Sequence, residues 1–438
     1  MTAIVETLVP RRLALGAHPP HDAARIVPPE AATLAETGLG RGVLHELTLK
    51  SLVSSGAATP AELSERLCLP LGPIEEVIAR LRTEAMLRVA RTAGPGEHLF
   101  MYELTDAGHA EALRAMARNG YVGPAPVSVE TYTLVQSRQP VRSVDVTREA
   151  IASALTALVL PQALIDSIGA AMVSTKSLLL SGAPGNGKTT IAAAMRRMLT
   201  GTVYVPHAID VDGQTITVFD ERIHERAGAL PRGLDRRFVP CRPPMIMLGG
   251  ELTLADLDLK YSGSRHYYDA PPTVKANGGI LVVDDLGRQR ISPQELLNRW
   301  VRALDTGVDS LHLQTGQSFP APFDSLLVLS TNIAIAELGD EAFLRRIRHK
   351  LVVPNPTRDE YLEILERSCA QADLRYDASA ASALLARFYD VAGREPRGCH
   401  PGDIIALLLD YATFHGAPPE CSRDTLFAAA EAYFAVSS

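Results

Sequence analysis

Residues 182–189 read Gly-Ala-Pro-Gly-Asn-Gly-Lys-Thr and follow directly on the apolar run Ser-Leu-Leu-Leu-Ser at 177–181. Glycines at this spacing are typical of a phosphate-binding loop, because they let the backbone turn several N–H groups toward a polyphosphate. An Ala-rich helix over about 188–199 would direct the positive end of its dipole at the same anion. The alternative is a glycine-rich turn with an incidental Lys. The buried strand before the loop and the helix after it favour a nucleotide site.

The side chains of this loop have predicted roles. Lys188 would reach the β- and γ-phosphates of a nucleoside triphosphate, and the Thr189 hydroxyl would ligand Mg²⁺. The other loop residues that we expect at the nucleotide are Gly182, Pro184, Gly185, Asn186, Gly187 and Thr190. The sequence therefore predicts ATP and Mg²⁺ as cofactors.

A second apolar run ends in two carboxylates. Residues 279–285 read Gly-Ile-Leu-Val-Val-Asp-Asp, which is typical of a buried parallel strand. Open α/β sheets bind ligands at the carboxyl ends of such strands. We expect Asp284 to hold Mg²⁺, directly or through water, and Asp285 to polarise the attacking water. The alternative is a core strand followed by a polar turn, and the loop upstream favours the catalytic interpretation.

Further candidates follow along the chain. Residues 323–332 are another apolar run that ends in Thr-Asn. Asn332 could orient the lytic water or contact the γ-phosphate, although Asn is also common in turns. An arginine supplied by a neighbouring subunit stabilises charge on a transferring phosphoryl group. Arg346 is the first candidate for that role and Arg345 the second, and the alternative for both is a solvated basic helix face.

The amino-terminal third has a different pattern. A helix over about 42–53 precedes Thr59-Pro-Ala-Glu62, in which Thr59 can cap a second helix and Glu62 completes a capping box. A third helix and two strand-like runs follow. This order over 39–118 resembles a winged-helix domain. Residues 1–38 predict a flexible arm, and residues 119–145, with three prolines, predict a linker.

Taken in order, residues 182–189, 280–285, 326–332 and 340–346 resemble the motifs of AAA+ ATPases. The resemblance covers about 146–435. It implies an α/β fold, with a P-loop αβα nucleotide-binding core and an α-helical lid. It also implies hydrolysis of a phosphoanhydride bond, a homo-oligomeric ring, often a hexamer, and ATP held at subunit interfaces. We place the core at 146–355 and the lid at 356–438.

Other stretches narrow the resemblance. Residues 275–280, Lys-Ala-Asn-Gly-Gly-Ile, look like the magnesium-chelatase and enhancer-activator branches of AAA+. The winged helix, the proline-containing linker, residues 275–290 and the run Arg-Gly-Cys-His-Pro at 397–401 together resemble a bacterial group of predicted ATPases with suggested chaperone activity. Arg288 and Arg290 would either form ion pairs at a subunit interface or be solvated.

Two positions depart from the family pattern. Asp285 stands where the family usually has Glu, and its side chain is one methylene shorter. Because this catalysis depends on positioning, slow hydrolysis or a nucleotide-sensing role stays open. Gly402 stands where many lids carry a nucleotide-sensing Arg. Arg397 could substitute for it, or could be a capping or surface residue.

Lys188 and Asp284 are 96 residues apart (284 − 188), which predicts an insertion at about 205–275. Residues 208–219 alternate around Asp212-Gly213, a hairpin signal. Turns rich in Arg and Pro follow at Arg236, Arg237, Arg242, Pro243 and Pro244. Tyr261, Tyr267 and Tyr268 could line a pore in a ring, or could pack locally.

Composition limits the cellular setting. The 438 residues are 46% apolar and 21% charged, as in soluble globular proteins, with a net charge of −7. The five cysteines form no CxxC pair, which favours a reducing cytoplasm. The apolar stretch 150–173 contains Pro161 and Asp166 and predicts amphipathic helices. We therefore expect a cytoplasmic protein with no membrane insertion.

Charge also bears on the partners. Winged helices often bind DNA, which needs a basic surface. Residues 1–120 contain 12 Lys and Arg against 14 Asp and Glu, a balance of −2. This favours a protein client or ring assembly, so the main hypothesis is a chaperone-like AAA+ ATPase that remodels a protein complex. The alternatives are a DNA-associated ATPase docked by its winged helix, and a nucleotide-gated assembly with slow hydrolysis.

Overall fold

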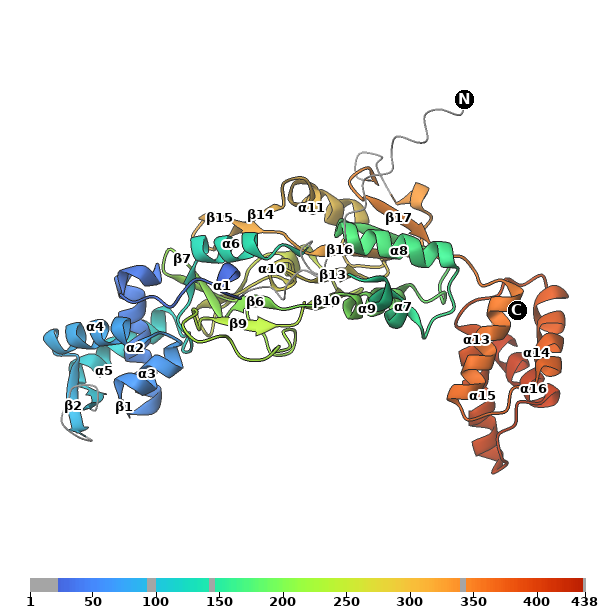
Figure 1. Cartoon of the computed structure of the whole chain (residues 1–438), viewed down its shortest axis with the longest axis horizontal. Coiled ribbons are helices and arrows are strands. Elements are labelled where there is room, and N and C mark those ends of the chain that lie inside the picture. Colours follow the sequence, from blue (N-terminus) through green and yellow to red (C-terminus); the bar gives the residue numbers. More distant parts are fainter. Residues whose placement is uncertain (1–22, 93–99, 142–145, 339–343, 436–438) are drawn as a thin grey trace.

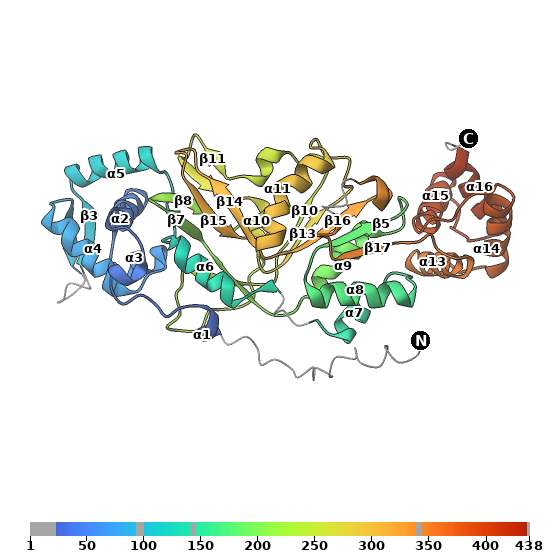
Figure 2. The same cartoon turned by 90° about the horizontal axis from the view of Figure 1, so that it is seen from above.

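The computed structural model describes residues 23–92, 100–141, 146–338 and 344–435. Figure 1 shows three parts along the long axis: helices with a small sheet at the amino-terminal end, a central α/β part, and a bundle of helices at the carboxyl-terminal end. The view from above in Figure 2 shows the same order. The α/β part therefore lies between the other two.

The central sheet has five parallel strands in the order β10-β13-β16-β5-β17. They are β5 (Leu178–Ser181), β10 (Met245–Leu248), β13 (Ile280–Val283), β16 (Leu326–Thr331) and β17 (His349–Val352). Parallel sheets are covered by helices on both faces, which explains why β5, β13 and β16 are continuous apolar runs. The predicted α/β fold with a parallel central sheet is confirmed.

Helices cover both faces of this sheet. Those on one face are α7 (Arg148–Leu155), α8 (Gln162–Ser174) and α9 (Lys188–Met198), and on the other lies α11 (Pro293–Thr306). Leu178 and Leu180 of β5 pack with the first set, whereas Leu179 packs in the core that holds the buried Trp300 of α11. Successive side chains of a strand point to opposite faces, so the sheet is the middle of three layers.

The predicted insertion forms a second sheet beside the first, with strand order β11-β12-β8-β7-β4. The strands of this sheet are β4 (Val127–Ser128), β7 (Ala208–Val211), β8 (Gln214–Thr217), β11 (Lys260–Ser262) and β12 (Tyr267–Asp269). A separate antiparallel pair consists of β6 (Val203–Pro206) and β9 (Phe238–Cys241). The expected hairpin is present as β7 and β8. Its turn residues Asp212 and Gly213 have φ of 49° and 82°, the left-handed values that this tight turn requires.

Short elements lie next to the insertion. The helix α10 (Pro272–Lys275) joins β12 to β13 of the central sheet. The antiparallel pair β14 (Val308–His312) and β15 (Ser318–Pro322) follows α11 and packs in the same apolar core as the insertion. The tyrosines of the insertion pack locally. Tyr268 is 2% exposed, and its hydroxyl accepts a hydrogen bond of 3.0 Å from the Gln314 N–H. The rings of Tyr261 and Tyr267 lie against Tyr268 and Tyr121, respectively. Local packing, and not a mobile pore loop, describes Tyr268 in this structure.

The amino-terminal part combines helices with a three-stranded sheet of order β1-β3-β2. Its elements are α2 (Arg41–Ser55), β1 (Ala57–Ala58), α3 (Pro60–Leu67), α4 (Leu71–Thr83), β2 (Leu87–Thr92), β3 (Phe100–Leu104) and α5 (Asp106–Arg118). The predicted capping box at the start of α3 is confirmed: Thr59 accepts from the Glu62 N–H, and the Glu62 carboxylate accepts from the Thr59 N–H. One apolar core holds these helices and strands together.

Two segments that we expected to be irregular are packed. Within the expected arm, α1 (Ala23–Ile26) and Val27 lie in the core of the insertion, and Val27 is fully buried. Within the expected linker, β4 pairs with β7, and α6 (Val129–Arg138) buries Tyr132 and Val135. A few apolar residues at helical spacing anchor these segments, although their proline content resembles that of a linker. Residues 1–22 and 142–145 lie outside the described residues.

The expected lid is a helical bundle. It contains α13 (Arg358–Gln371), α14 (Ala378–Leu385), a π-helical turn at Ala386–Asp390, α15 (His400–His415) and α16 (Arg423–Phe434). Its core is separate from those of the α/β part. Among the described residues, we find no helix whose length and apolar character would let it cross a membrane.

Asp210 in β7 provides a test of the insertion's stability. Its Oδ1 is buried without a hydrogen-bond partner, and its Oδ2 accepts only a long bond of 3.3 Å from the Gly213 N–H. Burial raises the pKa of Asp210 to about 6. Because the folded pKa exceeds the unfolded one, ionisation opposes folding, and stability falls as pH rises from about 4 through 6.

We expect Asp210→Asn to stabilise the protein by about 1–3 kcal/mol at pH 8, since the cost of a buried charge disappears. Urea denaturation at pH 8 and at pH 4 would measure this. At pH 4 the wild-type carboxyl is largely protonated in the folded state, so the gain should vanish there. An equal gain at both pH values would contradict the electrostatic explanation.

Candidate active site

The loop at 182–187 joins β5 to α9 at the carboxyl edge of the central sheet. Gly185 and Gly187 have φ of 82° and 81°, which residues with a side chain rarely adopt. Space is also restricted. A Cβ on Gly182 would lie 2.4 Å from the Val353 carbonyl oxygen, and one on Gly185 would lie 2.5 Å from the Cys399 Sγ. These glycines are therefore required by the close approach of β17 and of the lid.

Lys188, the first residue of α9, turns back into this loop. Its Nζ donates to the carbonyl oxygens of Gly182 and Ala183, both at 2.9 Å, and to Asn332 Oδ1 at 2.6 Å. The residue is only 5% exposed. Burial lowers the pKa of Lys188, while the charges of Asp285 and Asp284 act in the opposite direction. The ammonium group is thus held at the mouth of the loop, beside the two predicted acidic residues.

Thr189 and Asp284, the two predicted Mg²⁺ ligands, are in contact. The Thr189 hydroxyl lies 2.8 Å from one carboxylate oxygen of Asp284 and 3.1 Å from the other. Among the described residues there is no group of three or more His, Cys, Asp or Glu side chains that could hold a metal. A hydroxyl and one carboxylate fit Mg²⁺, which keeps several waters and takes its other ligands from substrate phosphates.

Asn332, at the end of β16, connects the loop to Asp285. Its Oδ1 accepts from Lys188, and its Nδ2 donates to Asp285 Oδ1 at 2.8 Å. Asp285 has a φ of 52°, an uncommon value for a residue with a side chain, and such conformations concentrate at functional sites. Gln289 supports it by donating to the carbonyl oxygens of Asp284 and Asp285, at 2.6 and 3.2 Å. Sequence analysis did not single out Gln289, because a lone Gln in a polar turn has no distinguishing pattern.

Arg345 and Arg346 lie at the opposite end of the sheet. They precede β17, which pairs in parallel with β5, so they lie near Ser177, where β5 begins. The Arg346 Nε donates to both carboxylate oxygens of Asp305, at 3.0 and 2.9 Å, and Arg345 is exposed. Within one chain, neither arginine joins the loop and the acidic pair. The first residues of the motif at 340–346 lie outside the described residues.

The lid contacts the loop through Asn186. Its Oδ1 accepts from the Gly398 N–H at 3.1 Å, and its Nδ2 donates to Asn355 Oδ1 at 2.7 Å. Asn355 in turn donates to the Glu395 carboxylate at 2.7 Å and accepts from Arg397 Nη1 at 3.3 Å. Asn355 and Glu395 escaped sequence analysis because their partners are distant in sequence and no local pattern marks them.

The lid position of Gly402 is open, with no atom within 4 Å of a Cβ built there. Arg397, the proposed substitute, lies beside the loop: its Cβ is 3.9 Å from the position of a Cβ on Gly185. Its charge also contributes to the lowered pKa of Lys188, after burial. The structure therefore places a lid cation near the phosphate-binding loop, at a position different from the usual one.

Comparison with known proteins identifies one segment. Residues 357–432, which comprise most of the lid, match a family model described as a domain of unknown function, DUF8689. A search of the curated proteins found no match.

Two solved structures illustrate the low similarity to known proteins. RuvB of Thermotoga maritima, described as a Holliday junction branch migration motor, is 16% identical, with a TM-score of 0.35 over 66% of this chain and 70% of that chain. NtrX from Brucella abortus in complex with ATP is also 16% identical, with a TM-score of 0.38 over 73% of this chain and 62% of that chain. The strand order and the layers of this chain themselves show a mixed α/β fold with a parallel central sheet.

Proposed function

We propose that this chain is a ring-forming AAA+ ATPase that couples binding and hydrolysis of Mg²⁺–ATP to the remodelling of a protein complex. One observation carries the proposal: Lys188, Asn332 and Asp285 form a continuous chain of hydrogen bonds at the carboxyl edge of the sheet. The Thr189–Asp284 pair lies next to it. These are the groups that ATP hydrolysis requires, from a phosphate-binding cation to a water-polarising carboxylate.

Each group has a definite task in this proposal. When bound, Mg²⁺ would neutralise charge on the phosphates of the nucleotide. Lys188 would donate to the phosphate oxygens in place of its carbonyl partners, and Thr189 and Asp284 would hold the ion. Asn332 orients the Asp285 carboxylate, which accepts the proton of the attacking water.

Turnover of the full-length chain would test the proposal. We expect phosphate release from ATP that requires Mg²⁺, together with nucleotide-dependent assembly by size-exclusion chromatography with a non-hydrolysable analogue. Assembly without measurable turnover would instead select the nucleotide-gated alternative. That alternative is favoured by the contacts of Asp285, because both of its carboxylate oxygens already have a partner. One accepts from Asn332, and the other lies 3.8 Å from Arg288. If the chain showed no turnover and no nucleotide-dependent assembly, the ATPase proposal and the nucleotide-gated alternative would both be refuted.

Arg346 provides a test of the ring. An arginine finger is worth about 10³–10⁵ in turnover. We therefore expect Arg346→Ala to bind ATP normally but to lose at least about 100-fold in turnover. Because the residue would act on a neighbour's nucleotide, adding a Lys188→Ala chain with intact Arg346 should partly restore phosphate release.

The controls separate this role from local structure. Asp305→Asn removes the carboxylate that pairs with the Arg346 guanidinium and should leave most turnover intact. Arg345→Ala tests the second candidate. Loss of turnover in Asp305→Asn, with no rescue in the mixture, would show that Arg346 acts through folding of its own chain.

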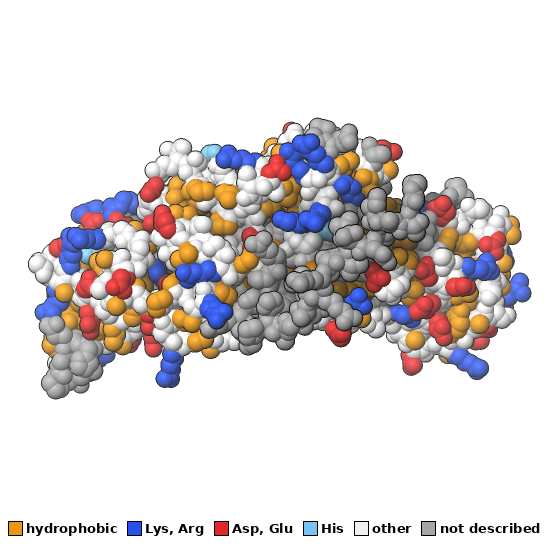
Figure 3. Space-filling model, turned by 45° about the horizontal axis from the view of Figure 1, so that its top comes forward, with side chains coloured by type: hydrophobic (Ala, Val, Ile, Leu, Met, Phe, Trp, Pro, Cys, Tyr) orange, Lys and Arg blue, Asp and Glu red, His pale blue; other side chains and the backbone are white. Residues whose placement is uncertain are grey.

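The charges at the amino-terminal part favour a protein partner over DNA. Arg80 pairs with Glu84 at 3.0 Å, and Arg88 pairs with Glu103 at 2.7 Å. These pairs neutralise two of the arginines that a DNA-binding winged helix would present. In Figure 3, basic and acidic side chains are interspersed over the face shown. DNA affinity depends on neutralising many phosphates, so this surface suits docking of a protein better.

A further inference from the structure

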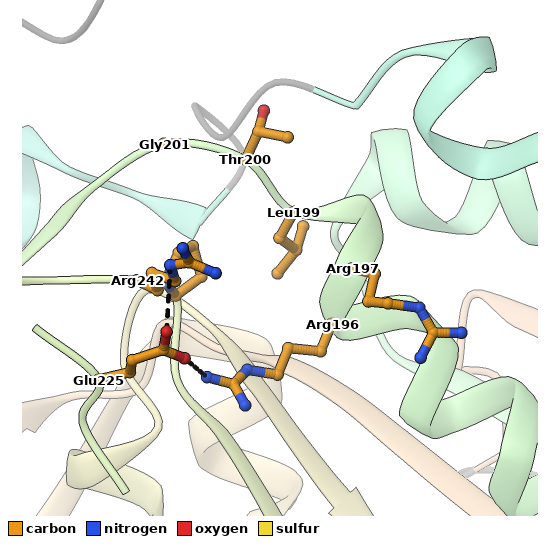
Figure 4. A pocket seen from close by; sticks show the side chains of 8 residues that line it. Arg196, Arg197, Leu199, Thr200, Gly201, Glu225 and Arg242 are labelled. Atoms are coloured by element: carbon orange, nitrogen blue, oxygen red, sulfur yellow. Dashed lines mark hydrogen bonds and ion pairs between the residues drawn. The ribbon is translucent and has the colours of Figure 1, made fainter. Parts of the chain in front are cut away.

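A pocket of about 450 Å³ lies where the carboxyl end of α9 meets the insertion (Figure 4). Arg196 and Arg197 belong to the last turn of α9, and Glu225 and Arg242 come from the insertion. None of them has a role in the proposed nucleotide site. Three guanidinium groups and one carboxylate give the pocket a surplus of positive charge, in a chain whose net charge is −7.

Glu225 shows what this pocket recognises. One of its carboxylate oxygens lies 2.8 Å from Arg196 Nη2, and the other lies 3.3 Å from Arg242 Nε. Figure 4 shows both arginines pointing toward this one carboxylate from different directions. Two arginines from different parts of the fold thus converge on a single carboxylate, each through a charge-assisted contact to one of its oxygens.

The carboxylate in this position is exchangeable. The side chains of Arg196, Glu225 and Arg242 are 40%, 50% and 66% exposed, so water screens both ion pairs. Exposed pairs of this kind contribute little to stability. A carboxylate from another molecule could replace Glu225 at small cost. Arg197 also lines the pocket, but its guanidinium points away from this carboxylate (Figure 4). Its Nη2 donates to the Ala154 carbonyl oxygen, which fixes it at the edge of the pocket.

We propose that this pocket docks an acidic segment of a protein partner, whose Asp or Glu side chain displaces Glu225 from between Arg196 and Arg242. Glu225 then acts as a built-in competitor that weakens docking. Lys188 begins the same helix eight residues before Arg196 (196 − 188), about 12 Å away at 1.5 Å per residue. The docking site is therefore distinct from the nucleotide site, and the proposal stands whether or not the chain hydrolyses ATP.

The surroundings favour separate carboxylates over a nucleic acid. Nearby arginines of the insertion have their own acidic partners: Arg222 pairs with Asp220 at 2.9 Å, and Arg226 lies 3.8 Å from Glu221. A nucleic acid backbone needs a continuous basic track, because its affinity comes from neutralising successive phosphates. Here the positive surplus is confined to one pocket, which suits one or two acidic side chains.

Fluorescence anisotropy with a labelled peptide of alternating Glu and Gly would test this, in nucleotide-free buffer at low salt. We expect wild type to bind it and not the matched Gln-Gly peptide. Glu225→Gln should bind about two- to fivefold tighter, because the internal competitor is neutral. The double variant Arg196→Ala/Arg242→Ala should bind at least about tenfold more weakly, and Arg242→Ala alone should give an intermediate loss.

A charge-matched control is Arg222→Ala/Arg232→Ala, which removes two exposed arginines outside the pocket and should keep wild-type affinity. Equal weakening by both double variants would overturn the proposal, since net charge alone would explain it. Weaker binding of the Glu-Gly peptide by Glu225→Gln would also overturn the proposal. A single-stranded oligonucleotide that binds through Arg196 and Arg242, with no peptide binding, would show that the pocket takes phosphates instead.

Discussion

Lys188→Ala is expected to fold normally and to lose ATP binding by at least about 100-fold. The Nζ of Lys188 reaches both the loop carbonyls and Asn332, and the residue is nearly buried. Hydrogen bonds between charged groups are worth about 1.5–3 kcal/mol each, and the ammonium would make at least two with the phosphates. A loss of about 3 kcal/mol corresponds to a factor of more than 100 in the dissociation constant.

Isothermal titration calorimetry with Mg²⁺–ATP measures this loss directly. Lys176→Ala is the matched control: it removes an exposed lysine just before β5, at the end of that strand opposite the loop, and should bind ATP as wild type does. Thermal midpoints would show that both variants are folded. If Lys188→Ala bound ATP within about threefold of wild type, the loop would not be the phosphate site, and the proposed ATPase would fall with it.

The parts of this site that sequence predicts are those with local signatures. The phosphate-binding loop is one continuous stretch, and Asp284 follows an apolar run that could only be a buried strand. Because parallel strands end at one edge, such runs are expected to bring their terminal polar residues close to the loop. In the structure Lys188 donates to Asn332, and the adjacent Thr189 donates to Asp284. The capping box at Thr59 and the hairpin turn at Asp212 are local for the same reason.

The features that escaped prediction depend on contacts between distant residues. Asn186 and Asn355 are 169 residues apart, and nothing near either one indicates the other. The segment 119–145 resembled a linker because its three prolines and its polar residues outweigh Tyr132 and Val135. Those two side chains are nevertheless enough to bury one face of the helix at 129–138. The residues around Tyr268 have the composition of a mobile loop. Its partner in the sheet is Ile216 of β8, which lies 52 residues earlier in the chain. Tertiary packing decided these cases.

The second large change in stability is expected at a buried ion pair within the insertion, whose arginine also contacts segments nearer the amino terminus. Arg237 and Asp235 are 3% and 4% exposed, and three donor–acceptor contacts of 2.7–3.1 Å join the guanidinium to the carboxylate. The Arg237 Nη1 also donates to the carbonyl oxygens of Thr37 and Pro126, at 2.9 and 3.0 Å. One side chain thus links three segments that are distant in sequence.

We expect Arg237→Ala to lower the free energy of unfolding by about 3–5 kcal/mol, because it leaves a buried carboxylate and two carbonyl oxygens without their donor. Urea denaturation would measure the change. The chain contains its own control in Arg222, which pairs with Asp220 at the same spacing of two residues but has a side chain that is 88% exposed. Arg222→Ala should leave the denaturation curve almost unchanged.

The double variant Asp235→Ala/Arg237→Ala distinguishes the buried charge from the lost contacts. If the unpaired carboxylate is the main cause, removing it as well should recover part of the stability, since the cost of one uncompensated buried charge disappears. If the bonds to Thr37 and Pro126 are the main cause, the double variant should be as unstable as Arg237→Ala. In that case limited proteolysis should cut near residues 37 and 126 before the central sheet unfolds, because those segments are held to the insertion by this arginine. A wild-type unfolding curve for Arg237→Ala would contradict both explanations.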